Sequence, residues 1–513
     1  MTGPTRPRPM FRLGHLLERR AQLHPDRTAL VFGDRAWTYG QLRDWIVTTA
    51  RQLRRHGAGP DSVVAYVGAS RPEVFVLMYA TARIGGVFVP VNGAATPPEI
   101  AYLLTDSGAA FLVTDAACAA VLAEDGTVPP DVTRLCLDEE PPDGYSVLSR
   151  TPDTAAEEPG DDTPAPVGED DLALIAYTSG TSGRPKGVLL THGNVFWSCV
   201  NGLLGLDLAR DDVTLITTPV FHIAVLSGVG SYTWAKGGTV ILEPAFSVDG
   251  FLTTVRRHRV SVTFAVPAML ALIARHPGFA AADLSSLRWI LSGGAAAPAP
   301  VAGVFHRRGI PVLSSYGLTE TAAGVTYRDP RDGPGCSGEA GLAAPLAEVR
   351  IVDPDNRPVP HGTTGEIVVR SPSVAAGYLG LPEDSAAARD AGGWFHGGDR
   401  GYLDPEGRLV VVGRIKDTII TGGENVDPTE VEEALAACPC VDEAAVVGTP
   451  DPVWGEVVTA IVVPAEGADC SLEGIQKFLS ASLTRHKIPR RLEVRDRLPR
   501  TATGKLQRSL LRG

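Results

Sequence analysis

The chain has 513 residues, a net charge of −12 and 44% hydrophobic residues. This length exceeds that of one ordinary domain, so two or more packed units are expected. The acidic balance argues against nucleic acid or an anionic membrane as a partner, because both need clustered Lys and Arg.

The first twenty residues contain no apolar run of the length that a secretion signal or a membrane span needs. We therefore expect a cytoplasmic protein without a membrane span.

Short β-branched runs alternate with helical patterns from residue 11 to about residue 148, as at 63–67, 86–91 and 111–114. Strands separated by helix-length stretches predict an α/β fold with parallel neighbours. Residues 151–170 are rich in Pro, Asp, Glu, Thr and Ala and predict a surface linker.

A loop rich in Gly, Ser and Thr follows the apolar run at 172–177. Its glycines let backbone N–H groups approach an anion, and Lys186 adds a cation, so the loop predicts phosphate binding rather than a plain surface turn. A Walker A loop is excluded, because Pro185 precedes Lys186 and Gly187 follows it. The loop residues that we expect to contact the nucleotide are Thr178, Ser179, Gly180, Thr181, Ser182, Gly183 and Lys186.

Three further motifs follow in order: Ser-Tyr-Gly-Leu-Thr-Glu-Thr at 315–321, Phe-His-Gly-Gly-Asp at 395–399, and Gly-Arg-Ile-Lys-Asp at 413–417. Alone, the first is typical of a helix cap and the second of a turn. Together with the phosphate loop, they resemble the adenylate-forming superfamily of acyl-CoA synthetases, peptide-synthetase adenylation domains and beetle luciferases. The resemblance is strongest to bacterial fatty-acid or aryl-acid CoA ligases.

The resemblance implies a large N-terminal domain of two α/β sheets plus a small β-barrel, over residues 1–415. A small, mobile α+β C-terminal domain is expected over 416–513, with a hinge at Lys416. The large domain would bind the acid and ATP.

The resemblance also implies roles for the motif residues. Tyr316 would lie by the adenine and Asp399 would accept the ribose hydroxyls, whereas Glu320 would hold Mg²⁺, since a carboxylate is the hard oxygen ligand that this ion prefers. Many members carry Thr where this chain has Gly397. The remaining nucleotide contacts implied are Gly317, Thr319 at the α-phosphate, and Arg414 near the ribose and phosphates.

Lys505, in Thr-Ala-Thr-Gly-Lys at 501–505, resembles the lysine that bridges the carboxylate and the phosphates during adenylation. A cation there offsets the repulsion between the two anions. Gly422 and Gly423 resemble the residues that line the thiol tunnel after the small domain rotates, and glycine would let a slender pantetheine arm pass. We therefore expect ATP, Mg²⁺ and coenzyme A as the small-molecule partners.

His222 resembles the histidine that borders the carboxylate site and the thiol tunnel. Amino-acid-activating relatives usually place an aspartate there, so an α-amino acid substrate is disfavoured. The expected acyl pocket also includes Val266, Gly293, Gly294 and Ala295, which are small or apolar and favour a neutral monocarboxylate over malonate. The same residue types would serve in any core. With Lys505, Glu320 and Thr181, His222 completes the predicted catalytic set.

Three alternatives remain open. The acyl group could pass to the phosphopantetheine of an acyl carrier protein instead of CoA. The chain could be a catalytically silent homologue that acts as a binding protein, although Lys186, Glu320, Asp399, Arg414 and Lys505 argue against this. An oxygen-dependent luciferase is the third alternative.

Overall fold

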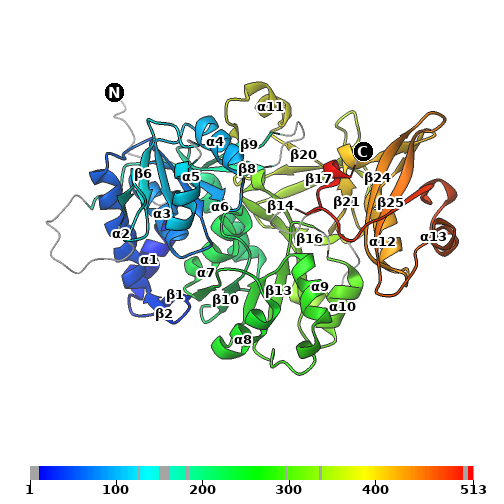
Figure 1. Cartoon of the computed structure of the whole chain (residues 1–513), viewed down its shortest axis with the longest axis horizontal. Helices are drawn as coiled ribbons and strands as arrows, with labels where there is room; N and C mark the ends of the chain where they lie inside the picture. The colour runs from blue at the N-terminus through cyan, green and yellow to red at the C-terminus, as the bar shows by residue number, and fades with distance from the viewer. Residues whose placement is uncertain are drawn as a thin grey trace.

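The computed structural model describes residues 11–124, 127–148, 162–178, 184–295, 297–333, 338–500 and 506–511. Chain order runs across the molecule from the N-terminal sheet, through the second sheet, to the C-terminal domain at the opposite end (Figure 1). The α/β fold class is confirmed, and each of three sheets has its own helices.

The first sheet has eight strands, and its central strands are parallel because helices connect them. In spatial order these are β19 (Gly377–Tyr378), β9 (Lys186–Thr191), β8 (Leu172–Thr178), β4 (Val87–Asn92), β3 (Val63–Gly68), β5 (Phe111–Thr114), β6 (Thr133–Cys136) and β7 (Ser146–Val147). The helices of this part are α1 (His15–Leu23), α2 (Tyr39–Arg55), α3 (Glu73–Arg83), α4 (Pro97–Asp106) and α5 (Ala116–Glu124).

The second sheet has thirteen strands and changes from parallel to antiparallel at β14. Its parallel half contains β1 (Thr28–Phe32), β11 (Thr239–Leu242), β10 (Val213–Ile216), β12 (Val262–Phe264), β13 (Trp289–Ser292) and β14 (Val312–Leu318), with β2 (Arg35–Thr38) antiparallel at the edge. The antiparallel continuation, where we expected the small barrel, contains β15 (Ala323–Tyr327), β16 (Glu339–Ala343), β21 (Leu409–Arg414), β20 (Phe395–Leu403), β18 (Gly365–Arg370) and β17 (Glu348–Val352).

The helices that follow β9 in the chain are α6 (His192–Gly205), α7 (Gly230–Lys236), α8 (Val248–His258), α9 (Pro267–Arg275), α10 (Ala299–His306) and α11 (Pro382–Ala387), and α11 contacts β19 of the first sheet. A π-helical segment, Ala224–Val229, precedes α7. Local sequence explains several starts: the Thr191 side chain caps α6, and Pro267 opens α9, where its missing N–H costs nothing.

The two large sheets share one apolar core. The rings of Phe75 on α3 and Trp234 on α7 meet edge to face at 4.9 Å, and the Trp234 indole donates to the carbonyl of Ala29 at 2.8 Å. The burial of apolar side chains in this shared core, with the Trp234 indole hydrogen-bonded, holds the two sheets together.

The C-terminal domain has its own sheet and its own core, as expected for a small α+β unit. Its strands are β23 (Glu424–Val426), β22 (Ile419–Thr421), β25 (Gly455–Pro464), β24 (Val441–Asp451) and β26 (Arg491–Val494), and its helices are α12 (Pro428–Ala436) and α13 (Leu472–Leu479). A short 3₁₀ helix, Ile415–Asp417, joins it to β21. The boundary after residue 415 and the hinge role of Lys416 stay predictions.

Within the described residues, none of the helices combines the length and the apolar character needed to cross a bilayer.

Candidate active site

The predicted phosphate loop connects two antiparallel strands, β8 and β9, in which Thr178 pairs with Lys186. Residues 179–183, and therefore Thr181, lie outside the described residues. The Lys186 ammonium contacts the carboxylate of Asp384 at 2.8 Å. Gly187 is required next to it, because a Cβ there would lie 2.9 Å from the Ile175 side chain.

The predicted magnesium ligand, Glu320, lies in a 3₁₀ turn, Thr319–Thr321, directly after β14. Its Oε1 accepts a hydrogen bond from the Tyr378 hydroxyl at 3.0 Å, and its backbone oxygen accepts one from the Ala375 N–H at 2.7 Å. The next residue pair, Ala322 and Ala323, has positive φ angles of 55° and 139°. Such strain in non-glycine residues is concentrated at functional sites.

The predicted ribose carboxylate, Asp399, lies on β20 and is only 5% exposed. Its Oδ1 forms an ion pair with Arg414 Nε at 2.9 Å, and its Oδ2 accepts a hydrogen bond from the Tyr316 hydroxyl at 3.0 Å. Burial, followed by the charge of Asp399, raises the pKa of Tyr316. The hydroxyl therefore stays protonated and donates to the carboxylate. Three motifs that are far apart in the sequence meet at this point.

Two glycines allow this close packing. A Cβ on Gly317 would lie 2.0 Å from the backbone oxygen of Ala323, and one on Gly397 would lie 2.6 Å from the Leu318 side chain. A side chain at 397 would therefore require the Leu318 side chain to move, whereas one at 317 would meet backbone.

The predicted acyl pocket lies at the carboxyl ends of adjacent parallel strands, where open α/β sheets bind ligands. Val266 follows β12, and Gly293 follows β13, which pairs with β12. A Cβ on Gly293 would lie 3.4 Å from the Phe264 ring, whereas Gly294, with φ 82°, opens onto free space. Ala295 follows and is exposed.

His222 lies in the segment between β10 and the π-helix. Burial lowers its pKa to about 4, so the ring is neutral at pH 7. Its buried Nε2 has no hydrogen-bond partner among the residues that the structure describes, so a ligand polar group could satisfy it. The π-helix joins this region to the Glu320 turn, because the Ser227 hydroxyl donates to the Ala322 carbonyl.

The predicted thiol-side residues are not brought to this cluster. Gly422 and Gly423 form the exposed turn between β22 and β23, with φ angles of 59° and 85°. The turn packs against Trp454 of its own domain, and the Gly422 N–H donates to the Trp454 carbonyl at 2.9 Å. Both residues need glycine for this conformation. Their role in the thiol tunnel stays a prediction.

Lys416 is exposed in the 3₁₀ connection, and Lys505 lies outside the described residues. Close to the C-terminus, Arg508 contacts Glu432 on α12 at 2.5 Å and Asp417 at 3.9 Å. The end of the chain is therefore attached to the connection between the domains.

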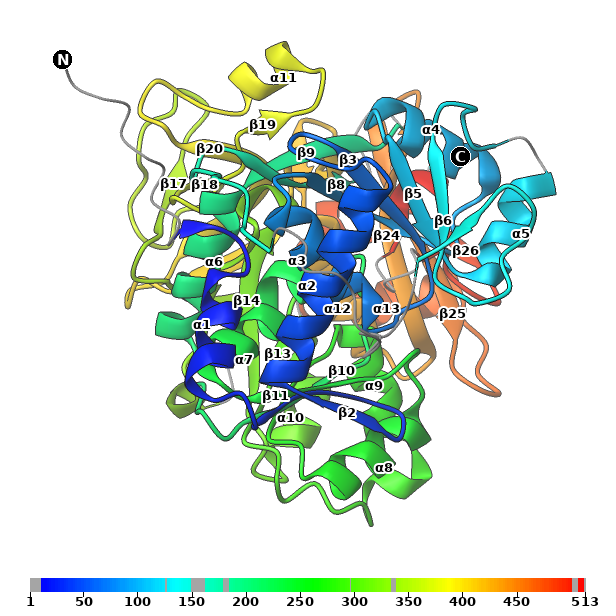
Figure 2. The same cartoon turned by 90° about the vertical axis from the view of Figure 1, so that its left-hand side faces the viewer.

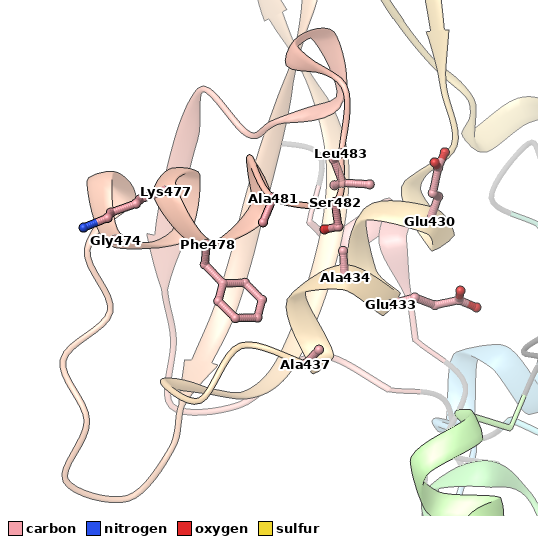
Figure 3. A pocket seen from close by; sticks show the side chains of 10 residues that line it. All are labelled: Glu430, Glu433, Ala434, Ala437, Gly474, Lys477, Phe478, Ala481, Ser482 and Leu483. Carbon is pink, nitrogen blue, oxygen red and sulfur yellow. The ribbon is translucent and has the colours of Figure 1, made fainter.

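A separate open groove lies between α12 and α13 in the C-terminal domain (Figure 3). Phe478 extends from α13 towards α12, where Ala434 and Ala437 form an apolar surface. None of the predicted site residues that the structure describes lines it, so the nucleotide motifs, rather than this groove, define the candidate site.

The donor set at the motifs fits a nucleotide and a magnesium ion. Lys186 and Arg414 could supply cations for phosphates, the Asp399 carboxylate could accept hydrogen bonds from vicinal hydroxyls, and Glu320 could be an oxygen ligand. The described residues contain no cluster of three His, Cys, Asp or Glu side chains. A single carboxylate fits Mg²⁺ bound largely by phosphates and water, which is usual for this ion.

Sequence reasoning missed two neighbours of this cluster, Tyr378 and Asp384. Tyr378 contacts Glu320, and its ring centroid lies 5.4 Å from the Lys186 ammonium. The Gly-Tyr pair at 377–378 and the Pro-Glu-Asp start of α11 were available in the sequence. Nothing in their spacing connects them with residue 186 or 320.

The fold and the site define an adenylate-forming enzyme. Residues 17–379 match the AMP-binding enzyme family, and residues 430–505 match the AMP-binding enzyme C-terminal domain. The chain therefore belongs to the AMP-binding enzyme family and is an acid–thiol ligase of the AMP-forming acyl-CoA synthetase type.

Relatives match over almost the whole chain. The chain is 42% identical to a feruloyl-CoA synthase of Amycolatopsis sp, over 98% of each chain. It is 38% identical to an indoleacetate–CoA ligase of Aromatoleum aromaticum, over 98% of this chain and 97% of that one. Among solved structures, o-succinylbenzoate CoA synthetase from Bacillus subtilis with its acyl-adenylate intermediate is similar, with a TM-score of 0.84, 34% identity, and coverage of 97% and 98%.

Proposed function

We propose that the protein activates an aromatic monocarboxylic acid with ATP and Mg²⁺ and then forms its CoA thioester. The convergence of Lys186, Glu320, Asp399 and Arg414 carries the proposal, because it combines groups for phosphates, metal and ribose at one place. The similarity to synthetases for ferulate and indoleacetate, which are aromatic acids, supports the substrate class.

In the first half-reaction, a carboxylate oxygen attacks the α-phosphorus of ATP and pyrophosphate leaves. The cations Lys186 and Arg414 offset the negative charge of the phosphates, and Asp399 fixes the ribose. Bound Mg²⁺, held through Glu320, would act as a Lewis acid on the phosphate oxygens. Lys505 is predicted to bridge the carboxylate and the phosphates.

In the second half-reaction, the CoA sulfur attacks the acyl carbon, AMP leaves with the carboxyl oxygen, and the thiol proton is released. This step needs Gly422 and Gly423 at the adenylate, whereas the turn that they form is exposed here. The exposed turn supports a rotation of the C-terminal domain between the two steps, with Lys416 in the connecting segment as the proposed hinge.

The predicted acyl-pocket positions favour a neutral acid. Val266, Gly293, Gly294 and Ala295 carry no cation for a second carboxylate, and His222 is neutral because burial lowers its pKa. An aromatic ring also suits a pocket lined by small or apolar residues at the strand ends. Fatty acids and malonate are therefore expected to be poorer substrates.

The test is a pyrophosphate-release assay with ferulate, indoleacetate, benzoate, palmitate, 2-succinylbenzoate and malonate, with CoA present. Aromatic monocarboxylates should give the highest kcat/KM. Higher kcat/KM for palmitate or a dicarboxylate would contradict the substrate class, and no release with any acid would restore the binding-protein alternative.

The acceptor is tested separately with CoA and with a holo-acyl carrier protein, each supplied with ATP and the best acid. We expect an acyl-CoA product. Acylation of the carrier protein alone would replace CoA by a protein-bound phosphopantetheine. A cytoplasmic location stays a prediction.

A further inference from the structure

Residues 377–387, which lie outside the nucleotide motifs, contact two charged residues of those motifs, Lys186 and Glu320. Strand β19 adds to the edge of the first sheet, where Tyr378 pairs with Val188 of β9. Helix α11 follows, and in both views it lies at the edge of the molecule beyond β9 and β20 (Figures 1 and 2). The Tyr378 N–H donates to the Ser385 hydroxyl at 2.8 Å, so α11 is fixed relative to β19.

This segment places a carboxylate on the phosphate-loop lysine. Asp384 Oδ2 lies 2.8 Å from Lys186 Nζ, with side-chain exposures of 46% and 22%. The lysine also lies over the Tyr378 ring, at 5.4 Å from its centroid. Lys186 is therefore held by two neighbours from 377–387, and one of them neutralises its charge.

The contact opposes phosphate binding, because a triphosphate at Lys186 would meet the negative charge of Asp384. Like charges at short range repel, and an ammonium that is already paired offers less net attraction to a second anion. The pair is partly exposed, so its cost to a competing anion is modest.

We infer that Asp384 is the resident counter-ion of Lys186 and that the ATP phosphates displace it, so that Asp384 raises the KM for ATP. The inference rests on the proposed phosphate-binding role of Lys186. Asp384 is a positioning residue, because it acts through its contact with Lys186.

The substitution Asp384→Asn isolates the charge from the geometry. The Asn amide oxygen still accepts a hydrogen bond from the lysine, and the Tyr378 ring stays beneath it, so Lys186 keeps its position. Only the repulsion of the phosphates is removed. If Asp384 had only a structural role, the substitution would raise the KM for ATP, since a damaged site does not bind ATP more tightly.

The experiment measures the KM for ATP by pyrophosphate release at saturating acid, and the Kd for ATP by calorimetry without acid. For Asp384→Asn we expect both to fall about two- to fivefold, with kcat unchanged within about twofold. The gain should shrink at high salt, because screening weakens exposed charges.

The matched control is Glu383→Gln, which removes one negative charge from the same turn of α11. Glu383 is exposed and is expected to change the KM by much less than Asp384. A second control introduces Asp384→Asn into a Lys186→Gln background, where the gain in ATP affinity should disappear.

The inference is overturned if Asp384→Asn leaves both constants unchanged or raises them, if Glu383→Gln gives an equal gain, or if the gain persists without Lys186. These outcomes are independent of the proposed reaction. If the enzyme forms acyl-adenylate but Asp384→Asn leaves the KM for ATP unchanged, the proposed function stands and the inference about Asp384 is wrong. A chain that is inactive with every acid still reports the effect through the calorimetric Kd for ATP.

Discussion

The substitution Asp399→Asn is expected to weaken ATP binding strongly while leaving the fold intact. Both carboxylate oxygens already have partners, because one is ion-paired with Arg414 and the other accepts a hydrogen bond from Tyr316. The Asn oxygen can face Arg414, which has no acceptor, and its NH₂ can face the Tyr316 oxygen, which can accept. The local packing therefore survives.

The substitution instead weakens the binding of ATP. Hydrogen bonds to a charged acceptor contribute about 1.5–3 kcal/mol, so weakening those to the ribose raises the Kd for ATP about 10- to 150-fold. The unpaired Arg414 would attract the phosphates more strongly, but its side chain is 32% exposed, which limits this gain to about 1 kcal/mol. The net effect stays unfavourable, opposite in sign to Asp384→Asn.

The assay is the KM for ATP in pyrophosphate release, with thermal melting as the check on folding. Asp404→Asn is the matched control, because Asp404 makes a similar carboxylate–arginine contact, to Arg408 at 2.8 Å, in the same β-hairpin but outside the nucleotide cluster. A KM for Asp399→Asn within about twofold of wild type would refute the ribose assignment.

Three further predictions concern Lys505, Gly317 and two buried histidines. Lys505→Ala should abolish pyrophosphate release yet still transfer the acyl group from a supplied acyl-adenylate to CoA; equal loss of both steps would contradict its role. Gly317→Ala should lower the unfolding free energy by about 1–3 kcal/mol, since its Cβ would lie 2.0 Å from a backbone oxygen of β15. Denaturant unfolding measures this loss. Gly59→Ala is the control, because a Cβ at Gly59 has no neighbour within 4 Å. Burial lowers the pKa values of His192 and His222 to about 4, so the unfolded chain takes up protons first as the pH falls. Stability should therefore be full above pH 6.5 and fall towards pH 4, by up to about 1.4 kcal/mol per histidine per pH unit, and a flat denaturation profile would contradict this.

The sequence was sufficient for the fold class and for the family, and it predicted which residues would bind the nucleotide. Glycine, hydroxyl and lysine residues after an apolar strand predict a phosphate loop locally, because the loop chemistry depends on consecutive residues. Periodicity alone gave the alternation of strands and helices. The family motifs then assigned Glu320, Asp399 and Arg414, which the structure brings to one region.

Long-range contacts could not be read from the sequence. The Tyr378 contact with Glu320 and the Asp384 contact with Lys186 join segments 58 and 198 residues apart. Such contacts depend on which strand adds to the edge of a sheet, and no local pattern encodes the partner. The outward position of the Gly422–Gly423 turn also depends on how one domain packs on another.

The sequence by itself therefore determined which chemical groups this enzyme carries, because residue type fixes charge, hydrogen-bonding capacity and backbone freedom. Only the tertiary structure decided which of those charges are already paired. Asp399 and Asp384 carry the same carboxylate, yet the Asp399 side chain is 7% exposed against Tyr316 and Arg414, whereas the Asp384 side chain is 46% exposed on Lys186. Their opposite predicted effects on ATP binding follow from that difference in surroundings.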